Sequence, residues 1–106
     1  MKLTVRRDRL KCADLMDRDG FGCLLGHYLV ACGLSWQTID GWATPSHVHI
    51  HKALPKQARW LLTSEGYDSA EAQDVMMCSD EGKPERAIPV FAKHGVELVL
   101  VGPEED

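Results

Sequence analysis

The chain has 106 residues, of which 44% are apolar and 26% are charged, and its formal net charge is -4. These values are typical of one globular domain and exclude a disordered chain, a pair of domains and a strongly basic nucleic-acid-binding protein. The apolar runs are much shorter than the roughly 20 residues that span a bilayer, and the early charges do not fit a secretion signal. We therefore expect a single domain over residues 1–106, without membrane association, in the cytoplasm.

The two ends of the chain each predict a β-strand. Lys2–Val5 alternates polar with apolar residues, and Val96–Val101 is rich in β-branched residues. We expect these two strands to pair in a small sheet. Between them, Cys12–Met16 predicts a third extended segment, which ends in a turn at Asp17–Gly20 because an aspartate and a glycine tolerate positive φ there.

The most apolar segment, Gly22–Gly33, predicts a buried central helix, because it is apolar on nearly every side of a helical wheel. Cys23 and His27 lie one turn apart in it, the spacing of a thiol nucleophile beside a base. Apolar surroundings raise the pKa of a thiol, however, and no third residue is placed to orient the imidazole. We therefore expect no catalytic residues and no enzymatic activity.

Four shorter helices are predicted after the central one, each from a capping residue or a proline at its start. They lie at residues 35–40, 55–62, 68–78 and 84–94. Asp68 and Glu71 have the spacing of a capping box for the helix at residues 68–78. Pro89 falls inside the last and is expected to kink it or to delay its start to about Ile88. The sequence thus predicts an α+β fold in which about five short helices pack on the sheet formed by the terminal strands.

Three histidines, His47, His49 and His51, alternate with aliphatic residues. In an extended segment the three imidazoles point to one face, where they and a water molecule would form an open zinc site. Between Asp40 and Glu65 there is no carboxylate to support such ligands, so solvated loop histidines are the alternative. We expect no cofactor unless zinc binds these three residues.

Charge is distributed unevenly along the chain. Residues 1–18 contain six Lys or Arg and three Asp, whereas residues 60–82 contain six acidic residues and no Lys or Arg. A basic end and an acidic flank favour an oriented protein partner over direct binding of nucleic acid. A second interpretation is a phosphate site at Arg6, Arg7 and Arg9, with Trp42 stacking on a nucleotide base. The third is a solvated basic surface.

Several segments together resemble a family of small proteins from bacteriophages and prophages. The matching segments are 19–35, 43–45, 60–61 and 91–98. Members of that family also open with a short strand, and they carry a Cys-Cys-Leu-Gly signature at the head of the hydrophobic helix. Here Gly22 stands in place of the first cysteine, and Pro89 interrupts the last helix. The resemblance implies a phage origin and the fold, and it assigns no activity to particular residues.

Size, charge separation and this resemblance together predict a small phage accessory protein that binds and inhibits a host protein. The expected target is part of an antiviral defence system such as a CRISPR effector. Two alternatives stay open: a protein that sequesters a nucleotide signal through Arg6, Arg7, Arg9 and Trp42, and a metal-binding protein that uses the three histidines.

Overall fold

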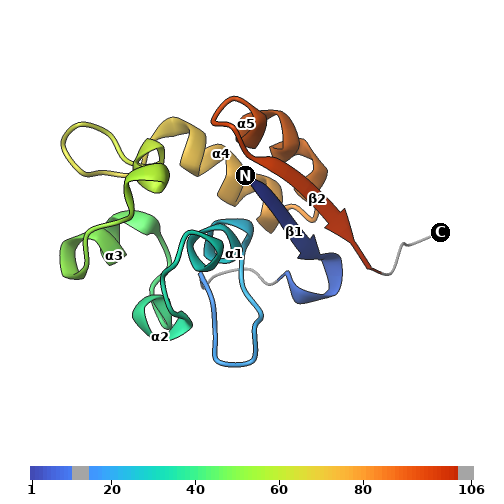
Figure 1. Cartoon of the computed structure of the whole chain (residues 1–106), viewed down its shortest axis with the longest axis horizontal. Coiled ribbons are helices and arrows are strands. Elements are labelled where there is room, and N and C mark those ends of the chain that lie inside the picture. Colours follow the sequence, from blue (N-terminus) through green and yellow to red (C-terminus); the bar gives the residue numbers. More distant parts are fainter. Residues whose placement is uncertain (11–14, 103–106) are drawn as a thin grey trace.

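The first and the last strand of the chain lie side by side in the computed structural model, which describes residues 1–10 and 15–102. Strand β1 (Lys2–Arg6) pairs in parallel with β2 (Glu97–Val101), and the two form a two-stranded sheet (Figure 1). The predicted pairing of the chain ends is therefore confirmed.

Strand β1 shows which face of the sheet packs against the rest of the protein. Leu3 and Val5 are buried, whereas Lys2, Thr4 and Arg6 between them are exposed. Successive side chains of a strand point to opposite faces, so this alternation buries one face of β1 and leaves the other to solvent.

The helices lie between the two strands in the sequence. They are α1 (Leu24–Ala31), α2 (Trp36–Ile39), α3 (Pro45–His51), α4 (Ala70–Asp80) and α5 (Ile88–Ala92), with the 3₁₀ helices η1 (Arg7–Arg9), η2 (Lys56–Leu61) and η3 (Pro84–Ala87). The predicted α+β fold, with short helices packed on a small sheet, is confirmed. Among the described residues, no helix has the length and apolar character needed to cross a membrane.

Helix α1 is the predicted central helix, two residues shorter at its start than expected. Cys23 is its N-cap residue, and Gly33 follows its end with a φ of 111°, a conformation that favours glycine. Most of its side chains are fully buried, but Val30 is 40% exposed and Ala31 is also exposed. The last turn of α1 therefore reaches the surface, so the expectation that the whole segment is covered was wrong there.

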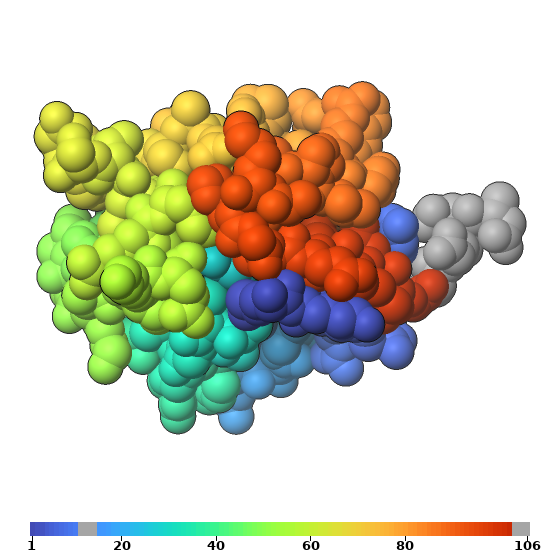
Figure 2. All heavy atoms as spheres, turned by 45° about the horizontal axis from the view of Figure 1, so that its top comes forward, coloured from blue at the N-terminus to red at the C-terminus, as the bar shows by residue number. Residues whose placement is uncertain are grey.

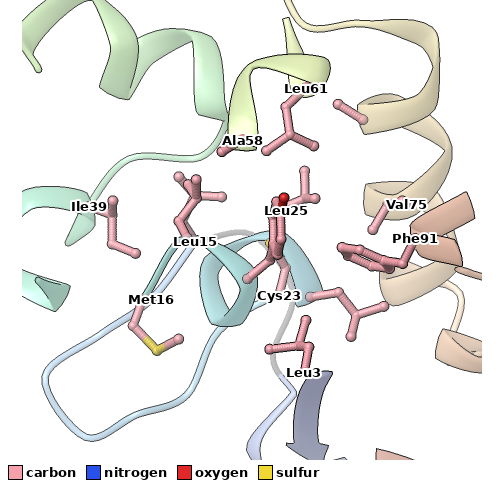
Figure 3. Packing of buried hydrophobic residues seen from close by; sticks show 14 of the residues in the cluster. Leu3, Leu15, Met16, Cys23, Leu25, Ile39, Ala58, Leu61, Val75 and Phe91 are labelled. Carbon is pink, nitrogen blue, oxygen red and sulfur yellow. The ribbon is translucent and has the colours of Figure 1, made fainter. Parts of the chain in front are cut away.

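Two glycines, Gly26 in α1 and Gly22 just before it, allow close contact with the backbone of Leu15. A β-carbon at Gly22 would lie 2.0 Å from the carbonyl oxygen of Leu15, and one at Gly26 would lie 1.5 Å from it. No real β-carbon approaches an atom this closely, so only glycine permits this packing. Leu15 itself is fully buried beside the helix (Figure 3).

An aromatic cluster joins α1 to η2 and α5. Phe91 packs edge-on against Tyr28 and Trp60, with ring centres 5.3 and 5.7 Å apart. The Tyr28 hydroxyl donates a hydrogen bond to the carbonyl of Gln57 at 2.7 Å and accepts one from the Trp60 indole N–H at 2.9 Å. Burial raises the pKa of Tyr28 to about 12, so its hydroxyl keeps the proton that it donates.

The predicted start and end of α4 both need correction. Ser69, not Asp68, caps α4, since its hydroxyl accepts a hydrogen bond from the Ala72 N–H at 3.1 Å. The Asp68 carboxylate instead accepts bonds from the backbone N–H and the hydroxyl of Ser46, at 2.9 and 3.1 Å. Helix α4 also continues two residues beyond the predicted end at Cys78.

The effect of Pro89 is confirmed, because η3 covers Pro84–Ala87 and α5 begins only at Ile88. Ser35 caps α2 as predicted, and the segment after Pro55 is a 3₁₀ helix rather than an α-helix. The predicted extended segment at Cys12–Met16 lies mostly outside the described residues. The turn after it is present, with a φ of 86° at Gly20.

Glu71 connects α4 to the two residues that follow α5, Lys93 and His94. The Glu71 carboxylate lies 2.8 Å from His94 Nε2 and 3.2 Å from Lys93 Nζ, and the His94 ring stacks on Trp60 at 4.0 Å. The hydrogen bond from His94, followed by that from Lys93, lowers the pKa of Glu71 below its ordinary value of 4.5. The ionised carboxylate is thus stabilised by folding.

The contacts of Glu71 predict that the free energy of unfolding depends on pH. Because the pKa of Glu71 is lowered in the folded protein, its contribution is complete above pH 4.5 and is lost as the pH falls through the folded-state pKa. We expect Glu71→Gln to reduce the free energy of unfolding at pH 7 and to leave it closer to wild type at pH 3. Urea titrations of both proteins between pH 3 and 7 measure this difference. A difference that is constant over this range would contradict the assignment.

Candidate functional site

The three histidines lie on a helix, which overturns the predicted extended segment. Thr44 is the N-cap residue of α3 and Pro45 occupies its first turn. Successive residues of an α-helix are about 100° apart, so His47 and His51 share one face while His49 points away from them. The predicted zinc site of all three imidazoles is therefore wrong. Threonine followed by proline was the signal for a helix start that the alternation of the histidines obscured.

Trp42 lies against the two histidines that share a face. Its ring centre is 4.6 Å from that of His51, in a stacked arrangement, and 6.1 Å from that of His47. His49 makes a different contact, because its Nδ1 accepts a hydrogen bond from the Leu54 N–H at 3.2 Å. Trp42 is half-buried rather than fully exposed, so it is not a freely presented stacking platform.

The three predicted phosphate-binding arginines have different partners. Arg6 donates two hydrogen bonds to the Asp8 carboxylate, at 3.0 and 2.9 Å. Arg9 donates to the carbonyl of Asp19 at 2.9 Å and covers the ring of Phe21 at 4.8 Å. Arg7 is the third, and it makes the long-range contact described below.

Trp42 does not complete a nucleotide site with these arginines. The segment between α2 and α3 that contains it lies at one side of the molecule, and η1 lies at the other (Figure 1). The structure therefore does not bring the predicted phosphate-binding residues and the base-stacking residue together.

Cys23 is buried in the interior of the protein, and His27 is half-buried. Cys23 is 5% exposed, and burial raises the pKa of its thiol. His27 Nε2 lies 3.2 Å from the carbonyl oxygen of Arg9, and burial lowers the pKa of its imidazole. A thiol that is held neutral in an apolar core is a poor nucleophile.

We expect Cys23 to resist alkylation in the native protein. Cys78 is only half-buried and serves as the internal comparison. Because Cys23 is only 5% exposed, we expect its peptide to label more than about tenfold more slowly than that of Cys78 at pH 8. Iodoacetamide labelling followed by peptide mass spectrometry measures both rates in one sample. Equal rates would show that the head of α1 is not covered in solution.

A polar cavity of about 390 Å³ lies where α4 ends, close to η1 and η3. It is lined by Arg7, Leu10, Ser79, Asp80, Gly82, Pro84 and Glu85. The segment around residue 80 is at the surface (Figure 2, upper right). Arg7 Nη1 lies 3.3 Å from Glu85 Oε2, an ion pair between residues 78 positions apart in the sequence. This contact joins η1 to η3.

Two polar atoms of the cavity residues are buried without a hydrogen-bond partner among the described residues. They are Nε of Arg7 and Oγ of Ser79, and the Ser79 residue is only 7% exposed. Nearly all buried polar groups of folded proteins are hydrogen-bonded, so two such atoms close to one cavity are unusual. The backbone N–H of Glu85 and the nearby Arg7 lower the pKa of the Glu85 carboxyl, which is therefore ionised at neutral pH.

The surface next to this cavity has an apolar component. Met77 is 56% exposed and precedes Asp80 by about one helical turn, so the two share a face of α4. Asp80 also borders a hollow of about 210 Å³ that is lined by Cys23, Ala43, Thr44 and Met76. We call Arg7, Met77, Ser79, Asp80 and Glu85 the α4-end site. Sequence reasoning found Arg7, but it missed Ser79 and Glu85 because only the fold brings them close to η1.

A wider groove of about 530 Å³ lies between the N-terminus and α5, where Met1, Ile88 and Val96 form part of its wall. Its wall is mostly apolar and contains neither of the two unpartnered polar atoms. Among the hollows described, the α4-end site therefore has the more specific chemistry. Comparisons with protein-family models, with curated proteins and with solved structures found no match to this chain, so the site must be interpreted from its own residues.

Proposed function

We propose that this protein is a small phage accessory protein that binds and inhibits a host protein, and that the partner docks at the α4-end site. The observation that carries the proposal is the pair of buried, unpartnered polar atoms beside that cavity, Arg7 Nε and Ser79 Oγ. Both atoms have almost no exposed surface, so a docking partner has to displace a neighbouring side chain before it supplies the hydrogen bonds that they lack.

The charges of the site specify what such a partner presents. The cavity lining includes the Glu85 carboxylate, and the neighbouring residues 60–82 contain six acidic residues and no Lys or Arg. This acidic flank favours a lysine or arginine of the partner, and a backbone carbonyl beside it suits the Arg7 Nε–H. Exposed Met77 offers an apolar contact at the rim, where a flexible thioether adapts to different side chains.

The chemistry of the site also suggests how binding inhibits. Proteins that act on nucleic acid present lysine and arginine to the phosphates of their substrate. A protein that occupies such a basic surface competes with the nucleic acid for it. Effectors of antiviral defence, including CRISPR effectors, are proteins of this kind, and the resemblance to phage proteins favours them as targets.

Two charge-introducing variants test this proposal. Met77→Arg places a positive charge at the rim of the site, whereas Ile50→Arg makes the same change on α3, where Ile50 is 75% exposed. Each tagged protein is expressed in a host that carries the defence system, and phage plating and co-purified proteins are measured. We expect the wild type and Ile50→Arg to restore plating and to retain one shared partner. Met77→Arg should lose both by at least about tenfold.

Two outcomes would overturn the proposal. In the first, the wild type has no effect on plating and retains no specific partner. In the second, Met77→Arg is as active as Ile50→Arg, which would place any interface elsewhere. Circular dichroism of the purified variants establishes that both are folded.

A further inference from the structure

We infer that His47 and His51 form a two-residue chelate for a divalent transition-metal ion on the exposed face of α3. The inference is independent of the proposed partner binding, because it concerns a different element and different chemistry. It replaces the alternating three-histidine site, which the helix excludes, by a pair that the helix itself creates.

The spacing of the two residues suits a single metal ion. On a helix, the β-carbons of residues four positions apart are about 5–6 Å from each other, on the same face. Imidazole nitrogens bind Zn²⁺ at about 2.0–2.1 Å, so two rings that lean toward one another can hold one ion between them. Two histidines at this spacing also provide the helical ligands of zinc metalloproteases.

The surroundings leave both imidazoles available. His47 and His51 are exposed, and within the described part of the chain neither makes a hydrogen bond or an ion pair. Both rings contact the same indole, that of Trp42, at 6.1 and 4.6 Å between ring centres. This shared contact places the rings on one small surface and limits their rotamers, which reduces the entropy lost when an ion binds.

His49 is excluded from this site although it lies between the other two in the sequence. Its side chain projects about 200° around the helix from His47, and its Nδ1 accepts the hydrogen bond from Leu54. No cluster of three or more potential metal ligands occurs among the residues that the structure describes. The ion would therefore have two protein ligands, and water completes its coordination.

Ligand type determines which ions bind. Imidazole suits copper, nickel and zinc, whereas Mg²⁺ and Ca²⁺ prefer oxygen ligands. The general order of divalent affinities predicts stronger binding of Ni²⁺ than of Co²⁺ or Mn²⁺. Ni²⁺ is the best probe, because it avoids oxidation of the free cysteines by Cu²⁺ and broadens the nuclear magnetic resonance signals of nearby groups.

The test is a Ni²⁺ titration of the full chain without a histidine tag, monitored by calorimetry and by broadening of the amide signals of α3. We compare the wild type with His47→Ala, His51→Ala and the matched control His49→Ala. We expect one site per chain in the wild type, with the signals around His47 and His51 broadened first. Loss of either ligand should weaken binding by at least about tenfold, since even residues that only support a ligand cost 10–100-fold.

The control variant, His49→Ala, distinguishes a specific two-histidine site from the general affinity of histidines for nickel. His49→Ala should bind Ni²⁺ within about twofold of the wild type. Equal weakening by all three substitutions, or binding that survives in His47→Ala and His51→Ala, would overturn the inference. Circular dichroism without metal checks that α3 remains folded in each variant.

Discussion

Gly26→Ala is expected to destabilise the protein by at least about 3 kcal/mol, which is severe for a domain of ordinary stability. A new β-carbon at this position would lie 1.5 Å from the carbonyl oxygen of Leu15, so backbone rather than a flexible side chain must move. In a helix interior the same substitution normally stabilises by about 1 kcal/mol, because alanine is the better helix former. The expected sign is therefore the reverse of that predicted by helix propensity.

Chemical denaturation followed by far-ultraviolet circular dichroism measures this effect. Ala31→Ser is the matched control, because it adds one heavy atom to the exposed end of the same helix and should change stability by no more than about 0.5 kcal/mol. A Gly26→Ala protein that is as stable as the wild type would show that Leu15 does not pack against α1 in this way.

Phe91→Ala is expected to cost about 3–5 kcal/mol, the usual range for removing a fully buried phenylalanine. Phe91 is 0% exposed and touches both Tyr28 and Trp60, so its loss leaves a cavity between α1, η2 and α5. The edge-on contacts contribute to this cost beyond the buried area. Urea unfolding monitored by tryptophan fluorescence gives the change in free energy.

Ile88→Ala provides the comparison within the same helix. Ile88 is 39% exposed, so truncating it removes less buried surface and should cost less than about 1.5 kcal/mol. If Phe91→Ala cost no more than Ile88→Ala, the aromatic cluster would not be the junction between these elements.

The proposed partner site and the proposed metal site make separate demands on the protein. The first depends on polar and charged groups at the end of α4, and the second on two imidazoles of α3. Substitutions at Met77 should therefore leave Ni²⁺ binding unchanged, and substitutions at His47 should leave partner binding unchanged. Failure of one proposal leaves the other intact.

The sequence determined the features that depend on neighbouring residues. The alternation in β1 predicted its buried face, Pro89 delayed α5 to Ile88, and Gly33 ended α1, because each acts through the local backbone. Ser35 was likewise identified as a cap from its own position. Local steric and hydrogen-bonding preferences depend on a few neighbouring residues, so a short sequence pattern is enough to predict them.

Short patterns failed where two local preferences competed. The alternation of His47, His49 and His51 fits a strand, whereas threonine followed by Pro45 fits a helix start, and the helix prevailed. Val48 is fully buried in that helix, which shows the tertiary reason: the core accepts one aliphatic side chain of α3 and leaves Ile50 outside. The neighbours that bury the segment decide whether it follows the two-residue repeat of a strand or the 3.6-residue repeat of a helix.

Only the tertiary structure decided the features that join distant parts of the chain. The contact of Gly26 with Leu15 and the pairing of Arg7 with Glu85 have no signature in either local sequence. The same holds for the burial of Ser79 without a partner. These features depend on how closely two backbones approach and on which side chains then meet, and both are fixed by packing of the whole domain rather than by the preferences of any one segment.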